Sequence, residues 1–338
     1  MIILTLILLI AVLLAATWFS KRYRTQEQRA PLSAPLGNDE AQAAKRLQRH
    51  VQMLAGTIGE RNMWHFERLE QAAGYIEGEL KEAGCPVRAH EYTLQGKTAR
   101  NIVAELAGSE RPEEIVVVGA HYDSVMGSPG ANDNATGVAA LLELGRSLCD
   151  ERPRRTLRLA AFVNEEPPFF KTHEMGSRVY AKEARQRGEK IVAMVSLETI
   201  GYYSDAEESQ MFPFPPLRFF YPTRGNFVAF VSNFRSRALL QRSLKGFRAA
   251  TDFPAEGLAA PEWLIGVDWS DQWSFWRSGY PAIMITDTAP FRYRHYHTMR
   301  DTPDKVDYGA LARVKSGLVG MVRGLAGSSE LQKQGGRR

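Results

Sequence analysis

Acidic and imidazole side chains follow apolar stretches at several separate places in this 338-residue sequence. They are His121, Glu165, Glu166, Glu198 and His297, and Asp133 joins them just before a predicted helix. One such residue alone is more typical of a solvated loop or a helix cap than of a site. Several of them at strand ends would share one edge of a sheet, where ligands of open α/β folds collect. Imidazole nitrogen and carboxylate oxygen are ligands that zinc accepts, so the pattern predicts a zinc site.

The number of candidate ligands fits two zinc ions rather than one. Two ions about 3.5–4 Å apart, bridged by one carboxylate, would use the whole set. A carboxylate that is not a ligand would then take the proton of the shared water. Glu165 and Glu166 are adjacent at a strand end, so their side chains diverge, and one can bind metal while its neighbour faces the water.

Two further residues are candidates for supporting roles. Asp123 lies two residues after His121 and suits a hydrogen bond that fixes the tautomer of that imidazole; the alternative is a turn acid in a loop. Tyr296 precedes His297 and is placed to donate a hydrogen bond to a developing oxyanion; the alternative is an aromatic ring packed under the site. We therefore expect Glu165, Tyr296 and Asp123 to be catalytic.

The elements that must position these residues alternate between strand and helix. Apolar runs predict strands at 87–94, 100–106, 115–118, 156–163, 191–197, 227–232 and 281–286. Amphipathic spacing predicts helices at 43–54, 67–83, 135–148, 175–186, 236–250 and 306–325. The first two strands read as an antiparallel pair. This alternation predicts an α/β, three-layer sandwich with a mixed, largely parallel central sheet.

Several motifs resemble those of the dinuclear-zinc aminopeptidase family. They are GAHYDS (119–124), ANDNATGVAALLEL (131–144), FVNEE (162–166), MGS (175–177), SLETIGY (196–202) and YHTMRDTPDKVDY (296–308). The family includes secreted bacterial leucine aminopeptidases and glutamate carboxypeptidase, with glutaminyl cyclases as relatives. The resemblance implies a zinc exopeptidase fold over residues 43–327, two zinc ions and a peptide substrate.

The resemblance also implies a role for each ligand. His121 and Glu198 would bind one zinc ion, Glu166 and His297 the other, and Asp133 both. Glu165 would be the general base.

Two positions depart from the family pattern. Glu198 stands where most aminopeptidases of the family carry Asp, and Gln272 stands where a His often follows Ser-Asp. The aromatic and proline-rich segment 212–225 is a candidate wall for the substrate, or ordinary packing.

Three functions agree with these features. The complete ligand set favours an aminopeptidase that hydrolyses N-terminal peptide bonds. A glutaminyl-cyclase-like transferase with a single zinc ion and a non-catalytic, receptor-like ectodomain on the same fold are the alternatives. The sequence does not indicate the preferred side chain, the physiological substrate or the oligomeric state.

Composition narrows the class of protein. With 44% hydrophobic and 24% charged residues, the chain is typical of a globular protein with a sizeable core. The net charge of +5 is mild and lies largely near the ends, and we see no basic helix typical of nucleic-acid binding. Only Cys85 and Cys149 are present, which excludes a disulfide framework. Two buried free thiols are favoured over a single bridge.

The N-terminal segment has the character of a membrane anchor. Residues 2–19 are almost wholly apolar and uncharged, just long enough to span a bilayer. We expect an uncleaved single-pass anchor at 1–20, with a cleaved signal peptide as the alternative. A linker at 21–42 and a polar tail at 328–338 complete the expected organisation. The basic cluster at 21–24 favours a cytoplasmic C-terminal side, whereas long domains cross largely regardless of charge. We expect the catalytic domain outside the cytoplasm.

Overall fold

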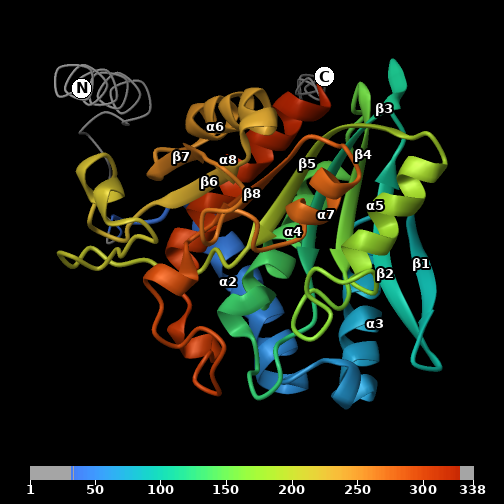
Figure 1. Ribbon diagram of the computed structural model, residues 1–338, viewed down its shortest axis with the longest axis horizontal. Helices are drawn as coiled ribbons and strands as arrows, with labels where there is room; N and C mark the ends of the chain where they lie inside the picture. Colours follow the sequence, from blue (N-terminus) through green and yellow to red (C-terminus); the bar gives the residue numbers. More distant parts are fainter. Residues whose placement is uncertain (1–31, 33, 328–338) are drawn as a thin grey trace, which may run out of the picture.

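An eight-stranded mixed sheet forms the middle of the molecule (Figure 1), in the order β1-β2-β4-β3-β5-β8-β6-β7. The computed structural model describes residue 32 and residues 34–327. The strands are β1 (Val87–Leu94), β2 (Lys97–Leu106), β3 (Arg111–His121), β4 (Arg155–Phe162), β5 (Lys190–Glu198), β6 (Val228–Ser232), β7 (Ala255–Ala259) and β8 (Ala282–Thr286). The α-helices described are α2 (Asn38–Val51), α3 (Phe66–Glu82), α4 (Thr136–Leu148), α5 (Gly176–Gln186), α6 (Arg237–Ala250), α7 (Gln272–Arg277) and α8 (Tyr308–Ala326).

The centre of the sheet is parallel. β3 pairs in parallel with β4 and with β5, and β5 pairs in parallel with β8. Antiparallel pairs flank this centre, with β1 and β2 on one side and β6 against β8 on the other. Parallel neighbours end at the same edge, so the residues that follow β3, β4 and β5 come together there.

Helices cover both faces of the sheet and bury its β-branched strands. In β3, Val116 and Val118 join a core cluster with residues of α2, α3, α4, α6 and α8. Ile115 and Val117 point the other way, into a second cluster with residues of α5 and α7. A continuous apolar run is what a strand covered on both faces requires. The predicted α/β three-layer sandwich is therefore confirmed.

Some elements differ from expectation. The short strand β7 and the six-residue helix α7 were not predicted. Helix α2 begins at Asn38, inside the expected linker. The backbone N–H of Gly37 donates a hydrogen bond to the side chain of Glu40 at 3.0 Å, and this bond caps the start of the helix. No helix among the described residues is long and apolar enough to span a membrane. The predicted anchor at 1–20 and the polar tail at 328–338 lie outside the described residues.

The expectation of two free thiols was wrong, because Cys85 and Cys149 form a disulfide with a Cα–Cα distance of 5.1 Å. Cys85 follows the C-terminus of α3 and Cys149 caps the C-terminus of α4. Gly145 lets these helices approach closely: a Cβ there would lie 2.9 Å from Leu80 and 3.3 Å from the sulfur of Cys85. The two cysteines are 64 positions apart, so only the packing of α3 on α4 reveals the bridge.

Candidate metal centre and adjoining pocket

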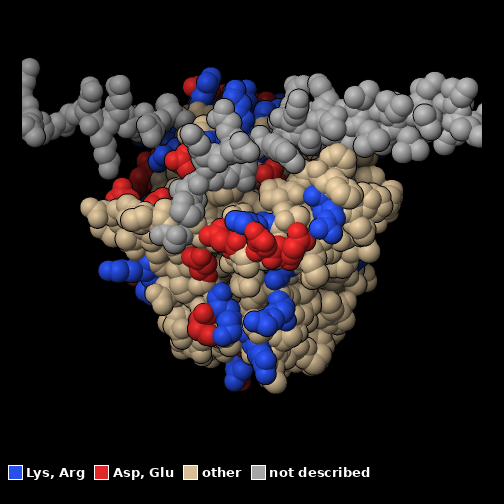
Figure 2. All heavy atoms as spheres, turned by 90° about the vertical axis from the view of Figure 1, so that its left-hand side faces the viewer, with Lys and Arg blue, Asp and Glu red and all other residues tan. Residues whose placement is uncertain are grey.

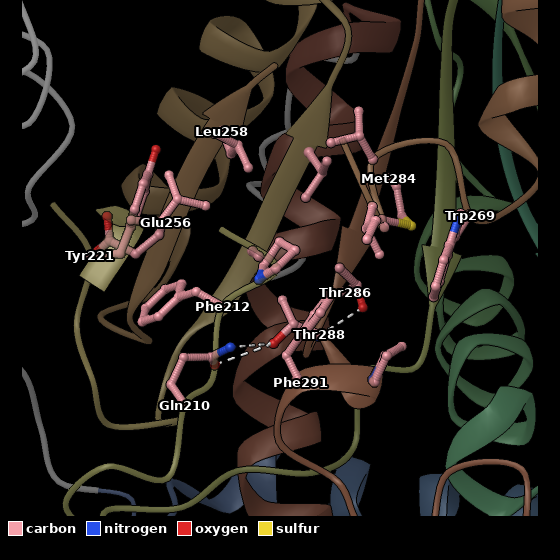
Figure 3. A pocket seen from close by; sticks show the side chains of 18 of the residues that line it. Gln210, Phe212, Tyr221, Glu256, Leu258, Trp269, Met284, Thr286, Thr288 and Phe291 are labelled. Atoms are coloured by element: carbon pink, nitrogen blue, oxygen red, sulfur yellow. Dashed lines mark hydrogen bonds between the residues drawn. The ribbon is translucent and has the colours of Figure 1, made fainter. Parts of the chain in front are cut away.

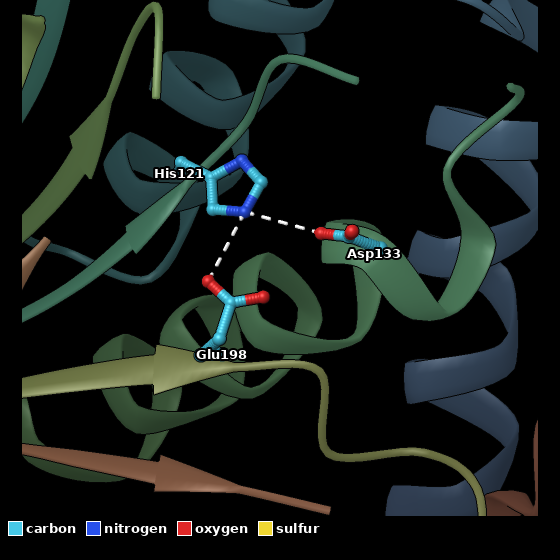
Figure 4. Close-up of side chains that lie close together, drawn as sticks. All are labelled: His121, Asp133 and Glu198. Atoms are coloured by element: carbon cyan, nitrogen blue, oxygen red, sulfur yellow. Dashed lines mark ion pairs between the residues drawn. The ribbon is translucent and has the colours of Figure 1, made fainter. Parts of the chain in front are cut away.

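Three side chains from three elements converge at the carboxyl edge of the sheet (Figure 4). His121 ends β3, Glu198 ends β5, and Asp133 lies in the turn that precedes α4. The Nε2 of His121 lies 3.2 Å from Oδ1 of Asp133 and 3.3 Å from Oε2 of Glu198. All three residues are buried, so this is not a solvated surface cluster.

A second group shares Asp133 with the first. Its other oxygen, Oδ2, lies 3.0 Å from Nε2 of His297, which in turn lies 3.3 Å from Oε2 of Glu166. In each group the potential ligand atoms all lie within 4.8 Å of one another. The carboxylate of Asp133 thus stands between two imidazoles, with one oxygen toward each.

Several polar atoms of this centre have no hydrogen-bond partner among the described residues. They are Nδ1 of His121, Oδ1 of Asp133 and Nε2 of His297, all inaccessible to solvent. Buried polar atoms are normally hydrogen-bonded, so unsatisfied ones need an explanation. For Asp133 and His297, ligation of a metal ion is the simplest one, since the chemistry of the donors suits zinc.

The electrostatics of this centre shift the pKa values of its side chains. Burial lowers the pKa of His297, but Asp133 and Glu166 outweigh it and raise that pKa to about 10. Burial, together with the charge of Asp133, raises the pKa of Glu166 to about 7. Metal ligands must be deprotonated, so metal and protons compete for these atoms.

Glu165 lies beside both groups and belongs to neither. Its Oε2 is 3.9 Å from Nε2 of His121. Burial raises the pKa of Glu165 well above its usual range, and the neighbouring acids Glu198 and Glu166 add to this effect. A raised pKa makes the ionised carboxylate a stronger base. A carboxylate in this position, outside both ligand groups, is suited to accept a proton from a nearby water.

Asp123 connects the ends of β3 and β4. Its two oxygens accept hydrogen bonds from the backbone N–H groups of Glu165, at 3.1 Å, and Glu166, at 3.0 Å. Its Oδ1 also lies 3.5 Å from Nδ1 of His121. This side chain therefore orients the glutamate pair and stands against the imidazole, as a residue supporting metal ligands does.

Tyr296 stacks on the ring of His297, with the ring centroids 3.8 Å apart and the planes at 17°. Burial raises the pKa of its phenol well above the usual range, so the hydroxyl keeps its proton and can donate it in a hydrogen bond. The ring also lines the pocket described below. Both sequence hypotheses, packing beneath the site and a polar role toward substrate, agree with this position.

Sequence reasoning missed Arg61. This residue is fully buried, and its guanidinium donates hydrogen bonds to the carbonyls of Leu54, Gly59, Tyr122, Pro129 and Gly130. It therefore fixes the loop between β3 and Asp133. Burial lowers its pKa to about 10, opposed by the charges of nearby carboxylates, so it stays cationic at neutral pH.

Asp301 was also missed as a supporting residue, although it falls within the 296–308 motif. Its carboxylate accepts hydrogen bonds from the backbone N–H groups of Asn132, at 2.8 Å, and Asp133, at 3.0 Å. The hydroxyl of Tyr293 donates to the same side chain at 2.9 Å. Asp301 therefore ties the segment that carries His297 to the turn that carries Asp133.

Gln272 lies outside both groups. It is fully buried, and its side-chain N–H donates to the carbonyl of Val267 at 3.1 Å. The neighbouring Asp271 is also buried, and burial raises its pKa to about 7. The departure from the family pattern at this position therefore leaves both candidate ligand groups complete.

An apolar pocket, whose labelled lining includes Phe212, Leu258 and Met284 (Figure 3), opens next to the metal centre. Glu198 and Tyr296 also belong to its wall. The segment 212–225 supplies Phe212, Pro213, Leu217 and Tyr221 to the lining, whereas Phe214 and Phe219 are exposed. The segment thus lines the pocket in part, and a role as a wall for the substrate stays a prediction. The rest of the lining comes mainly from β6, β7, β8 and the loop 265–269.

Comparison with known proteins supports the same chemistry. The family profile "Peptidase family M28" matches residues 101–322. The uncharacterized protein YfbL of Escherichia coli is 35% identical over 81% of this chain and 86% of its own length. A probable zinc metalloprotease of Leptosphaeria maculans is 29% identical over 75% of this chain, which spans 62% of that relative.

Solved structures share the fold. A zinc aminopeptidase from Bacillus subtilis superposes with a TM-score of 0.66 at 14% identity, covering 86% of this chain and 96% of the other. A glutaminyl cyclase from Tannerella forsythia superposes with a TM-score of 0.60 at 19% identity, covering 82% and 97%. At such identities the likeness concerns the fold.

Proposed function

Because this chain belongs to peptidase family M28 and is a zinc metallopeptidase, we propose that it is an aminopeptidase that uses two zinc ions and is attached to a membrane through residues 1–20. The observation that carries the two-ion proposal is the position of Asp133. One of its oxygens faces His121 and the other faces His297. A single carboxylate between two imidazoles is the arrangement that a pair of bridged ions requires.

In this proposal His121, Asp133 and Glu198 hold the first ion, and Asp133, Glu166 and His297 hold the second. Zinc supplies a Lewis acid for the peptide carbonyl and lowers the pKa of a bound water to about 7. The longer side chain of Glu198 still reaches the centre, and the hydroxyl of Ser270 donates a hydrogen bond to its Oε2 at 2.7 Å. That bond orients the carboxylate toward His121.

The protein's own groups perform the proton transfers. Glu165 accepts the proton of the attacking water and passes it to the amine that leaves. Asp123 holds the backbone of Glu165 and Glu166, so that the base and the ligand keep different directions. The hydroxyl of Tyr296 donates a hydrogen bond to the oxygen on which negative charge develops.

The apolar pocket would receive the side chain of the N-terminal residue of the substrate. It adjoins Glu198, and its wall includes Phe212, Leu258, Met284 and Phe291. Such a lining favours large apolar side chains, since one methylene in a hydrophobic pocket is worth about 1–3 kcal/mol. We expect leucine and phenylalanine substrates to be hydrolysed faster than alanine or glutamate substrates.

A panel of substrates tests this proposal. Aminoacyl anilides, N-blocked peptides and N-terminal glutaminyl peptides would be incubated with added zinc or with a chelator, and bound zinc would be counted. We expect hydrolysis of free N-termini only, loss of activity with chelator, and two ions per chain. Cyclisation of glutaminyl peptides with one ion would instead indicate a transferase, and no reaction with any substrate would indicate a non-catalytic receptor-like domain.

The proposed location is outside the cytoplasm. The disulfide between Cys85 and Cys149 supports it, since such bonds persist in oxidising compartments. Protease treatment of spheroplasts is the test, and we expect the catalytic domain to be degraded while the membrane is intact. A domain that is degraded only after permeabilisation would be cytoplasmic.

A further inference from the structure

A second hollow lies at the opposite edge of the sheet from the metal centre. It has a volume of about 640 Å³ and is lined by Glu114, Arg155, Val192, Ala193, Arg242, Lys245, Gly246, Ala249, Met321, Gly324 and Leu325. These residues come from the starts of β3, β4 and β5, from α6 and from the end of α8. We call it the α6–α8 cleft. Along β3, His121 lies seven positions after Glu114, a distance of about 23 Å along the strand.

The α6–α8 cleft carries a net positive charge. Three of its lining residues are cations and one, Glu114, is an acid. The charge of Glu114 is already offset, because Arg155 lies 2.6 Å and Lys190 2.9 Å from its carboxylate. Arg242 and Lys245 are exposed, and neither has an ion pair with a described residue. Helix α6 carries no acidic residue at all.

Charged side chains elsewhere on the surface include balanced groups. On the face seen in Figure 2, acidic and basic side chains intermingle along a central band. In the segment 204–225, Arg218 pairs with Glu208 at 3.2 Å and Arg224 with Glu207 at 2.9 Å. In the α6–α8 cleft, by contrast, the cations Arg242 and Lys245 lie beside the apolar residues Ala249, Met321 and Leu325.

We propose that the α6–α8 cleft binds the headgroup of an anionic phospholipid and so docks the domain on a membrane. Arg242 and Lys245 at α6 attract the lipid phosphate, and the apolar lining accommodates the adjoining glycerol and upper acyl carbons. Each cation near an anionic bilayer strengthens attachment about fivefold. Docked in this way, the domain presents the opposite edge, with the metal centre and the apolar pocket, to the surrounding solution.

The position of Leu32, the first described residue, is compatible with this docking. The carbonyl of Leu32 accepts a hydrogen bond from Arg313 of α8 at 3.4 Å. From Arg313 to Leu325 at the cleft, α8 rises about 18 Å. The eleven residues 21–31 that lead back to the proposed anchor can extend up to about 40 Å, enough to reach the bilayer at that edge. The docking relies on the proposed anchor only for nearness to a membrane.

A label in the cleft tests the proposal. The native cysteines are joined, so Ala249→Cys in the full chain gives one reactive thiol for a fluorophore. The chain would be added to vesicles of phosphatidylcholine alone or with phosphatidylglycerol, each with a headgroup quencher. We expect strong quenching only with phosphatidylglycerol, and its loss at high salt. Arg242→Gln with Lys245→Gln should weaken docking about 25-fold.

Two controls separate docking from general effects. Arg68→Gln with Lys81→Gln removes the same charge from exposed positions of α3 and should leave quenching unchanged. A label at Thr98→Cys, exposed in the hairpin near the catalytic edge, should remain unquenched. Flotation with phosphatidylcholine vesicles reports on the anchor separately.

Equal quenching in both lipids would overturn the proposal. So would quenching that appears only after removal of residues 328–338, because the chain's own C-terminal segment would then occupy the cleft.

Discussion

The carboxylate of Asp123 is hydrogen-bonded to the backbone N–H of Glu166 at 3.0 Å, and its second oxygen receives the N–H of Glu165 at 3.1 Å. One side chain at the end of β3 thereby sets the directions of both glutamates at the end of β4. Because it also lies 3.5 Å from Nδ1 of His121, it connects residues assigned to three different roles.

We predict that Asp123→Ala lowers both zinc affinity and kcat. Supporting residues of metal ligands typically contribute 10- to 100-fold, and here two backbone hydrogen bonds are lost as well. Competition of the protein with a fluorescent zinc chelator measures the affinity. Asp123→Asn keeps one acceptor oxygen, so its zinc affinity and kcat should lie between those of the wild type and of Asp123→Ala. Unchanged zinc affinity in Asp123→Ala would restrict this residue to a turn.

Glu165→Gln should abolish turnover and leave the metal content unchanged. Glutamine has nearly the same shape but cannot accept the proton, and general-base catalysis contributes about 10²–10⁴-fold. Kinetics with a leucine anilide, together with elemental analysis, provide the readout. If zinc is lost along with activity, Glu165 is a ligand and the roles of Glu165 and Glu166 must be exchanged.

Asp133→Ala should cause the loss of at least one zinc ion and nearly all activity. The change removes the carboxylate between His121 and His297, so two cations would be left without their shared counter-charge. Elemental analysis after gel filtration measures the metal, and circular dichroism checks the fold. Retention of both ions would remove Asp133 from the metal centre.

Removal of the disulfide by Cys85→Ser with Cys149→Ser should lower the free energy of unfolding by about 4 kcal/mol, given the 64-residue separation. Urea denaturation measures this change. Activity at low temperature should persist, because the bridge joins the ends of α3 and α4 away from the metal centre. A stability equal to that of the reduced wild type would confirm that the covalent bond, and not the side chains, is responsible.

Glu143 on α4 makes stability dependent on acid pH. It is hydrogen-bonded to both Nε and Nη2 of Arg46 on α2, each at 2.8 Å. Burial opposes ionisation, but His50 and Arg46 outweigh it and lower the pKa of Glu143 from 4.5 to about 2. A lowered folded-state pKa stabilises the fold above the unfolded value, and this contribution disappears as pH falls toward 2.

We therefore predict that Glu143→Gln destabilises the protein more at about pH 6 than at about pH 3. Urea denaturation of both proteins at the two pH values measures the difference, and subtraction removes the acid dependence of the metal centre. An equal difference at both pH values would show that the pair does not shift the ionisation of Glu143.

The sequence was most informative for candidate site residues that come at the end of a buried strand. His121, Glu166 and Glu198 come at the ends of largely apolar strands, so their shared edge could be predicted. The parallel order of β3, β4 and β5 then brings them together without further signals. Asp133 was found through its loop, but the sharing of its two oxygens depends on the turn before α4 and needed coordinates.

Features that have no local signal in the sequence were not predicted. Strand β7 has five residues, AEGLA, with a charge and a glycine, and does not resemble a buried strand. Arg61 lies in a polar stretch and becomes structural only because loops from both sides fold over it. The disulfide was missed for the same reason, since its partners meet through helix packing. The apolar pocket likewise combines segments more than 80 residues apart.

Arg61 has a consequence for how the metal ligands are held. Its guanidinium donates hydrogen bonds to five backbone carbonyls of the loops around the metal centre, so these loops are fixed by bonds within the protein. The fixed positive charge also offsets part of the repulsion among the surrounding carboxylates. The backbone that carries the candidate zinc ligands is therefore positioned by a buried cation that does not itself bind the metal.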